Sequence, residues 1–174
     1  AVSLLTTTGF STEDFNNWPA MSNMLVFVLL FIGGSAGSTT GGLKIIRTIV
    51  ISRYLICELR RLLHPKGIYN IKLGNKIIDD DVVKATLGFY LFYIFIFIIT
   101  SIVLSTTGLD FITSLTASAS AIGNIGPGLG LIGPYNNWGH LTDFAKWLTS
   151  FCMLLGRLEI FTVMVFLSRS FWRV

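Results

Sequence analysis

The sequence predicts an all-α membrane protein in which one membrane span is broken by glycine. Of its 174 residues, 52% are hydrophobic and only 13% are charged, whereas a soluble domain carries about 25% charged residues. Residues 85–104 contain no charge, and a helix needs about 20 such residues to cross the hydrocarbon of a bilayer. The seventeen glycines follow no G-X-Y period, and the two cysteines cannot form a disulfide framework. These features exclude soluble, collagen-like and disulfide-rich classes.

A second predicted span is interrupted. Residues 24–32 (MLVFVLLFI) are apolar, but nine residues rise only about 14 Å as a helix, which is half a membrane. The chain continues as GGSAGSTTGGLK and then as the amphipathic segment IIRTIVISRYLI. Non-helical backbone is tolerated at membrane depth only where protein buries it or where it lines a wet cavity. We therefore expect residues 33–42 to form a loop inside the membrane. A further apolar stretch, residues 144–167, is long enough to span.

The basic residues predict an orientation. Nine of the thirteen Lys and Arg residues lie within residues 44–84, and two more follow near the C-terminus. The positive-inside rule places both regions in the cytoplasm, so the segments near Gly9 and Gly123 face outward. Because these basic residues flank spans, they favour a cytoplasmic loop over a nucleic-acid-binding surface.

Within the cytoplasmic stretch, residues 68–73 and 76–78 flank Gly74-Asn75 and predict a short hairpin. Asp79, Asp80 and Asp81 precede the uncharged span, where carboxylates stabilise a helix N-terminus, and we favour this capping role over a cation site. The histidines have no metal partners at ligand spacing, and the sequence contains no catalytic constellation. The sequence therefore predicts no enzyme.

Both halves of the chain contain the same order of motifs. TTTGFS at residues 6–11 corresponds to SAIGNIG at residues 120–126 when Gly9 is placed on Gly123. In each copy, Asn-Asn-Trp and a long apolar run follow. In the second copy, Asp110 can cap a helix over residues 110–121, which is too short to cross and ends at a glycine-rich segment. A span, a half-helix, a glycine-rich strand and a span form a re-entrant pore loop.

A pore loop of this kind suits a cation. The half-helix ends with its carbonyls near the middle of the membrane, and the strand that follows exposes carbonyl oxygens that can replace the water around K⁺ or Na⁺. Glycine allows the positive φ values that aim these carbonyls at one axis. We expect Gly9 and Gly123 to have this role; the alternative is that both form tight turns in packed loops.

The loop at residues 33–42 has five glycines in ten residues, which lowers its helical propensity and allows movement. Its hydroxyls can satisfy freed backbone groups or contact passing ions. A phosphate-binding loop is a weaker alternative, because Leu43 separates Gly42 from Lys44 and no strand precedes the loop. The candidate gate residues are Gly33, Gly34, Ser35, Gly37, Ser38, Thr39, Thr40, Gly41 and Gly42, together with Arg157.

Arg157 lies within an apolar run, where an unpartnered arginine costs about 2.5–3.5 kcal/mol. Glu159 is two residues further on, so it lies on another helix face and is a poor direct partner. We predict that the charge of Arg157 repels K⁺ in the inner pore and that its hydrogen bonds to the loop hold the loop shut. The alternative is a salt bridge that only fixes helix packing.

Four ordered motifs, TTTGFST, FIGGSAGSTTGGLKIIR, SASAIGNIGPGLG and LLGRLEIFTVMVFL, cover nearly the entire chain. Together they resemble the TrkH branch of the bacterial Trk/Ktr potassium-uptake proteins. The resemblance implies potassium-channel-like units of span, pore helix, filter strand and span, with four units around one pore. Residues 1–67 would end the third unit, residues 68–84 would form a cytoplasmic linker, and residues 85–174 would form the complete fourth unit.

The resemblance also implies a site and partners. Backbone carbonyls would bind K⁺ as the transported ion, with no other cofactor, and the equivalent arginine of the family lies close to the loop. A homodimer in the bacterial inner membrane is implied, with the remaining pore units of the same protein and a nucleotide-binding regulatory subunit docked on the cytoplasmic basic face. The implied filter residues are Thr7, Thr8, Gly9, Phe10, Ala121, Ile122, Gly123 and Asn124.

Two other functions fit parts of the sequence. One is a secondary transporter whose discontinuous helices bind an ion or small solute at the membrane midplane, and the other is a membrane enzyme that binds phosphate through the glycine loop. Both predicted copies run in the same direction, whereas an inverted repeat is typical of a transporter. The sequence therefore favours potassium uptake through a gated pore.

Overall fold

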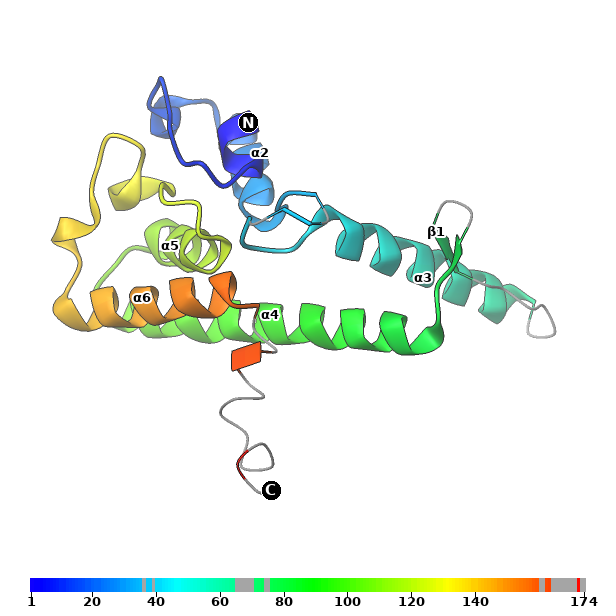
Figure 1. The fold of residues 1–174 in the computed structure, drawn as a ribbon. Helices are drawn as coiled ribbons and strands as arrows, with labels where there is room; N and C mark the ends of the chain where they lie inside the picture. The colour runs from blue at the N-terminus through cyan, green and yellow to red at the C-terminus, as the bar shows by residue number, and fades with distance from the viewer. Residues whose placement is uncertain are drawn as a thin grey trace.

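The computed structural model describes residues 1–35, 37–38, 40–64, 71–73, 76–159, 162–163 and 172. Most of these residues are helical, which confirms the predicted fold class. In Figure 1, helix α4 runs along the molecule, with α5 and α6 packed at its C-terminal part and α3 beside its N-terminal part. The elements are α1 (Val2–Leu5), η1 (Phe15–Asn17), α2 (Ala20–Phe31), α3 (Ile45–Leu63), β1 (Lys72–Leu73), β2 (Lys76–Ile77), α4 (Asp80–Thr106), α5 (Phe111–Gly123), η2 (Gly130–Ile132), η3 (Trp138–His140) and α6 (Asp143–Arg157).

Helix α4 contains the predicted uncharged span and extends beyond both of its ends. Within the described residues it is the one helix that is long and apolar enough to cross a membrane. Asp79 is its N-cap residue, and Asp80 and Asp81 lie in its first turn, where carboxylates interact favourably with the helix dipole. The aspartates lie at the helix N-terminus as expected, but the side chain of Asp79 makes no capping hydrogen bond among the described residues, so the structure supports the interaction with the helix dipole and not the expected cap.

The predicted break in the second span is also present. Helix α2 ends at Phe31 and α3 begins at Ile45, and the ends of the loop between them are joined by a parallel bridge of Ile32 with Leu43. The amide of Gly33 donates to the carbonyl of Leu43 at 2.8 Å, and that of Ile45 donates to Gly34 at 3.1 Å. The loop thus closes on itself, and its ends have backbone partners.

Helix α5 begins where the sequence predicts, because the Asp110 carboxylate accepts a hydrogen bond from the amide of Thr113 at 3.2 Å. The helix is short, and from Thr116 to Gly123 every residue is buried. Its alanines, serines and glycine allow α4 and α6 to approach closely, so α5 forms the centre of the packed part of the molecule.

Helix α6 differs from the prediction of one continuous span over residues 144–167. It ends at Arg157, with Leu158 as the C-cap residue, and Glu159 takes a left-handed conformation with φ of 54°. A left-handed residue cannot continue a right-handed helix. Residues 160–161 and 164–171 lie outside the described residues.

The predicted cytoplasmic hairpin is present where it can be assessed. Strands β1 and β2 are antiparallel, with Leu73 opposite Lys76, and the amide of Ile78 donates to the carbonyl of Ile71 at 2.9 Å. Ile71 is buried together with Val50 of α3 and Val83 of α4, so the hairpin closes the end of this helix pair. The turn at residues 74–75 and the start of the predicted hairpin at residues 68–70 lie outside the described residues.

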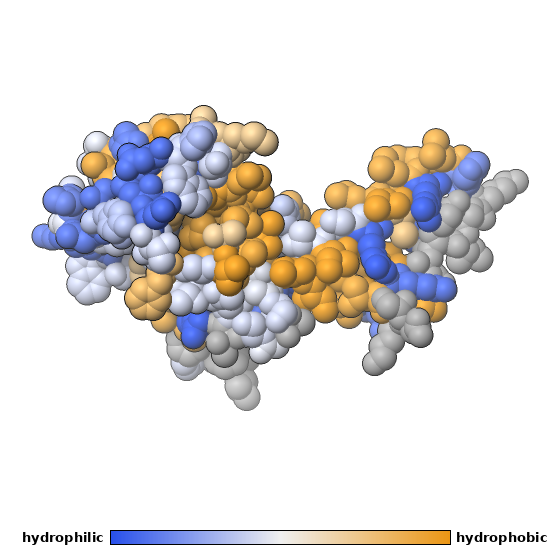
Figure 2. Space-filling model, turned by 90° about the horizontal axis from the view of Figure 1, so that it is seen from above, coloured by the Kyte–Doolittle hydropathy of each residue, from blue (hydrophilic) through white to orange (hydrophobic). Residues whose placement is uncertain are grey.

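The surface is divided by hydropathy. In Figure 2, hydrophilic residues gather at the end that carries η2 and η3 and again at the opposite end, around α3, whereas hydrophobic residues cover much of the surface between them. Helix α4 exposes large apolar side chains, namely Leu91, Phe95, Ile98, Ile99 and Ile102. Contiguous exposed apolar surface of this kind fits contact with lipid or with further protein.

We expect the Asp110→Ala variant to lower the stability of the protein by about 0.5–2 kcal/mol, because it removes a helix-capping hydrogen bond. Asp79→Ala is the matched control, since the side chain of Asp79 makes no capping bond among the described residues. Thermal unfolding in detergent would measure both. An equal loss in the two variants would contradict the capping role of Asp110.

Candidate functional site

The chain leaves helix α1 and helix α5 with the same backbone conformation. After α1, Thr7 and Gly9 have φ values of 51° and 79°; after α5, Asn124 and Gly126 have values of 54° and 106°. In both cases a left-handed residue is followed, two positions later, by a glycine with positive φ. We refer to these segments as the 7–9 turn and the 124–126 turn.

The hydrogen bonds of the two turns also correspond. The amide of Thr8 donates to the carbonyl of Ser3 at 2.9 Å, and the amide of Ile125 donates to Ser120 at 3.1 Å. One constant shift in residue number relates all of these features, and it places Gly9 on Gly126.

The predicted pairing of Gly9 with Gly123 is therefore wrong. Helix α5 continues through Gly123, so the prediction of an extended strand over residues 121–124 is also wrong. The carbonyl of Ala121 accepts a hydrogen bond from the amide of Asn124 at 3.2 Å and so closes the helix end. The missed signal is Asn-Ile-Gly, because asparagine and glycine are the residues that most readily take positive φ.

Gly123 has a different place in the structure, as the last residue of α5, directly before the 124–126 turn. The backbone of Gly41 packs directly on the Gly123 carbonyl, where a Cβ on Gly41 would come within 2.5 Å of the oxygen. Gly156 of α6 is packed against the carbonyl of Ile122 in the same way. The glycine-rich loop and α6 therefore both pack directly against the backbone at the end of α5.

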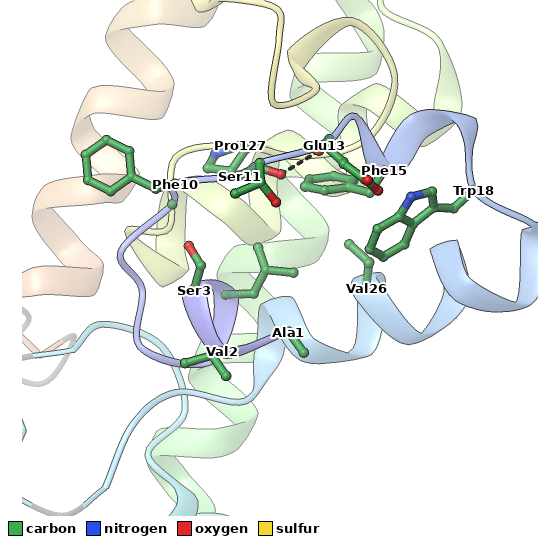
Figure 3. A pocket seen from close by; sticks show the side chains of 13 residues that line it. Ala1, Val2, Ser3, Phe10, Ser11, Glu13, Phe15, Trp18, Val26 and Pro127 are labelled. Atoms are coloured by element: carbon green, nitrogen blue, oxygen red, sulfur yellow. Dashed lines mark hydrogen bonds between the residues drawn. The ribbon is translucent and has the colours of Figure 1, made fainter.

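The two turns lie next to each other. A side chain at Gly9 would overlap the carbonyl oxygen of Ile125 and contact Pro127. Beside Gly9, a pocket of about 370 Å³ is lined by residues of α1, of the segment after it and of α2. Figure 3 shows Ser3, Ser11, Phe15 and Val26 around this pocket, with Phe10 pointing away from it; the Phe10 side chain is 83% exposed.

Outside the turns, Asn16 joins the two copies. Its side-chain amide donates to the carbonyl of Gly130 at 3.2 Å, and its oxygen accepts from the Gly130 amide at 2.9 Å. The hydroxyl of Tyr135 adds a bond to the carbonyl of Thr12 at 3.0 Å. A side-chain amide paired in this way with one backbone residue imitates a strand contact, so the outer loops of the two copies are held in register.

The loop at residues 33–42, which we name the gate loop, uses its hydroxyls on its own backbone. The amide of Gly34 donates to Thr40 Oγ1 at 3.1 Å, and the amide of Thr40 donates to Ser38 Oγ at 3.3 Å. This use of the hydroxyls was one of the two expected from the sequence. Ala36 and the predicted gate residue Thr39 lie outside the described residues.

The structure brings Arg157 and the gate loop together. Ser38, Thr40 and Gly42 share the lining of one pocket of about 270 Å³ with Arg157 and Glu159. Two basic residues that follow the loop, Lys44 and Arg47, complete that side of the pocket.

Glu159 is the acidic partner of Lys44 and Arg47, a pairing that the sequence did not predict. Its carboxylate lies 2.7 Å from Lys44 Nζ and 2.9 Å from the guanidinium of Arg47. The Arg47 guanidinium also stacks over the ring of Phe89 at 3.9 Å. These contacts connect the start of α3, the chain after α6 and the middle of α4. Spacing along the chain could not have revealed them, because the charges come from segments far apart in sequence.

Residues 1–173 match the family model described as "TrkH: Cation transport protein". The chain belongs to this TrkH family. It is 43% identical over 173 residues to the Trk system potassium uptake protein TrkI of Halomonas elongata and 39% identical over 172 residues to TrkH of Escherichia coli. In both cases the match covers 99% of this chain and 35% of the relative.

The structure of a TrkH protein has the same fold. The crystal structure of the potassium transporter TrkH from Vibrio parahaemolyticus matches 99% of this chain, with a TM-score of 0.89 and 41% sequence identity. The match covers 36% of that protein. The chain thus spans about one third of the length of its TrkH relatives, and it matches their C-terminal part.

For this TrkH chain, we expect Gly156→Ala to lower stability, because the added methyl group would overlap the carbonyl of Ile122. Helix propensity alone predicts the opposite sign, a gain of about 1 kcal/mol. Gly88→Ala is the matched control, since Gly88 is an exposed glycine inside α4, and there propensity should dominate. Thermal unfolding of the two variants measures the difference, and a Gly156→Ala protein as stable as Gly88→Ala would refute the close packing.

Proposed function

We propose that this chain supplies part of a pore for potassium uptake across a bacterial inner membrane, without enzymatic chemistry. The names of its relatives support the transported ion, since they are Trk system potassium uptake proteins. The observation that carries the proposal is the pair of matching left-handed turns at Gly9 and Gly126, which lie side by side. Such backbone can present carbonyl oxygens to a dehydrated cation.

The ion-lining carbonyls would come from residues 7–10 in the first copy and from Asn124 and Ile125 in the second, because the Gly126 carbonyl accepts a hydrogen bond from the Trp138 indole at 3.1 Å. In the second copy this replaces the proposed role of Ala121, Ile122 and Gly123. The Ala121 carbonyl closes the helix, and the carbonyls of Ile122 and Gly123 face α6 and the gate loop. The Ile125 carbonyl instead faces Gly9, on the other turn, which is the side where the two turns would share an ion. Two turns provide two sides of an ion site, and the remaining pore units of the complete protein would provide the others.

The gate loop and Arg157 would control the inner side of this pore. The loop packs against the end of α5, where Gly41 meets the Gly123 carbonyl, and Arg157 lines the same pocket as the hydroxyl-bearing residues Ser38 and Thr40 of the loop. A fixed positive charge in that position repels K⁺ in a low-dielectric environment, and hydrogen bonds from the guanidinium would hold the loop shut.

The proposed orientation in the membrane follows from the distribution of basic residues along the chain. We propose that residues 44–84 and the C-terminus face the cytoplasm and that the two turns face outward, according to the positive-inside rule. A regulatory nucleotide-binding subunit would dock on the basic cytoplasmic face, and the complete protein would form a homodimer. The exposed apolar side chains of α4 support contact with the lipid bilayer or with other pore units.

The proposal predicts that Gly126→Ala impairs potassium uptake. The test uses a chimera in which this chain replaces the C-terminal third of Vibrio parahaemolyticus TrkH, expressed in a bacterium that lacks its own potassium uptake. The unmodified chimera should restore growth at low K⁺. Gly126→Ala should abolish it, because alanine is strained at φ of 106° and would rotate the peptide groups of the turn.

Gly108→Ala is the control for that experiment. Gly108 also has positive φ, at 89°, and a Cβ at either glycine would meet no described atom within 4 Å. The two substitutions therefore cause similar strain without a clash, but Gly108 lies in the turn after α4, away from the proposed pore. The assignment of Gly126 to the pore would be contradicted if both variants lost uptake equally, or if the Gly126→Ala variant grew at low K⁺ as well as the unmodified chimera.

A second prediction concerns the gate. In the same chimera, Arg157→Ala should raise K⁺ flux, because it removes the repelling charge and the contacts that hold the loop. Arg157→Lys retains the charge and should give an intermediate flux. Lys146→Ala, at a half-exposed position earlier in the same helix, should leave flux unchanged. Radioactive Rb⁺ uptake at equal protein amount measures this, and unchanged or reduced flux in Arg157→Ala would refute the gate.

A further inference from the structure

Helix α5 carries a row of hydroxyl groups on one face, at Thr113, Thr116 and Ser120. Their spacing of three and then four residues places them one above the other along the helix. All three side chains are fully buried, with exposed fractions of 0%, 1% and 0%. A buried hydroxyl requires hydrogen-bond partners. Thr116 donates within the helix to the carbonyl of Ile112 at 2.8 Å, and all three hydroxyl oxygens also have a partner outside the helix.

Each hydroxyl accepts a hydrogen bond from the returning chain. The amide of Gly126 donates to Ser120 Oγ, that of Leu129 to Thr116 Oγ1 and that of Leu131 to Thr113 Oγ1, each at 3.1 Å. The helix and the returning segment therefore run antiparallel, joined by three side-chain contacts at regular intervals. We name Thr113, Thr116 and Ser120 the hydroxyl ladder.

Because of peptide geometry, these hydrogen bonds also determine the direction of the carbonyl group that precedes each bonded amide. Because a trans peptide is planar, an N–H group that points toward α5 forces the carbonyl of the preceding residue to point away from it. The ladder thus directs the carbonyls of Ile125, Gly128 and Gly130 away from the helix. Two of these are found there: the Ile125 oxygen lies against Gly9, and the Gly130 oxygen accepts a bond from Asn16.

We propose that the hydroxyl ladder consists of positioning residues, which set the direction of the Ile125 carbonyl and thereby the discrimination between K⁺ and Na⁺. This proposal rests on the proposed pore function. A ring of carbonyls distinguishes cations through the number and placement of its oxygens. The amides of Asn124 and Ile125 bond to carbonyls of α5 and the Gly126 carbonyl accepts from the Trp138 indole, whereas the peptide group between Ile125 and Gly126 is oriented through its N–H by Ser120.

The ladder does not act through its volume. Thr116 can be replaced by valine, which has the same shape without the hydroxyl, or by serine, which keeps the hydroxyl and loses a methyl group. A role in packing requires the valine variant to behave normally. A role in positioning requires the serine variant to behave normally.

The test measures the ratio of K⁺ to Na⁺ uptake in the chimera described above. Ser120→Ala removes the bond to the Gly126 amide and should lower this ratio about tenfold, the effect of losing one buried hydrogen bond. Thr116→Val removes the bond from the Leu129 amide together with the bonds that Thr116 donates, so it should lower the ratio at least as much, and Thr116→Ser should retain it. Ser118→Ala and Thr149→Val are matched controls. Both residues are equally buried, and their hydroxyls donate to carbonyls of Phe97 and Ala145, outside the returning segment.

The outcomes separate the two proposals. An unmodified chimera with no K⁺ uptake contradicts the pore function, whereas active variants with an unchanged ratio overturn the ladder alone. The ladder is also overturned if the K⁺/Na⁺ uptake ratio falls equally in the two control variants. The same holds if Thr116→Val keeps the normal ratio while Thr116→Ser loses it. For a variant that transports too little for this assay, the purified protein is heated in increasing K⁺ or Na⁺, and the concentration of each ion that protects it from unfolding is measured. A tenfold smaller ratio of the Na⁺ to the K⁺ concentration than in the unmodified protein supports the ladder. An unchanged ratio overturns it.

Discussion

Two irregular segments, the returning segment after α5 and the gate loop, pack against the end of α5, and each polar group that they bury there needs a hydrogen-bond partner. The chain meets this constraint in two ways. The returning segment after α5 gives its amides to the hydroxyls of Thr113, Thr116 and Ser120, and the gate loop bonds to its own hydroxyls and to the backbone at its ends. This need explains why the buried part of α5 is rich in serine and threonine.

The same helix end supports both parts of the proposed mechanism. The 124–126 turn begins where α5 stops, and the gate loop packs on the last residue of α5 through Gly41. Gly156 brings α6 against the neighbouring carbonyl, so that Arg157 lies beside the loop. In a close-packed interior a shift of one of these elements requires the others to move. The proposed ion site and gate thus share one rigid support.

Much of this arrangement could be predicted because it depends on neighbouring residues. The absence of charge predicts α4, the carboxylate of Asp110 predicts the start of α5, and the glycines predict the break between α2 and α3. The register of the second turn could not be predicted in the same way. AIGNIG contains two glycines, and matching letters favoured Gly123, whereas the backbone repeat is counted from the end of the helix and selects Gly126.

The sequence by itself determined the class of protein, the type of most elements, the position of the broken span and the membership of the TrkH family, since hydropathy, capping and glycine content act locally. Tertiary structure alone decided which residues meet: Glu159 with Lys44 and Arg47, Asn16 with Gly130, and Gly41 with Gly123. These partners lie on segments far apart in the chain. Their contacts depend on how the helices pack, and local propensity carries no information about that geometry.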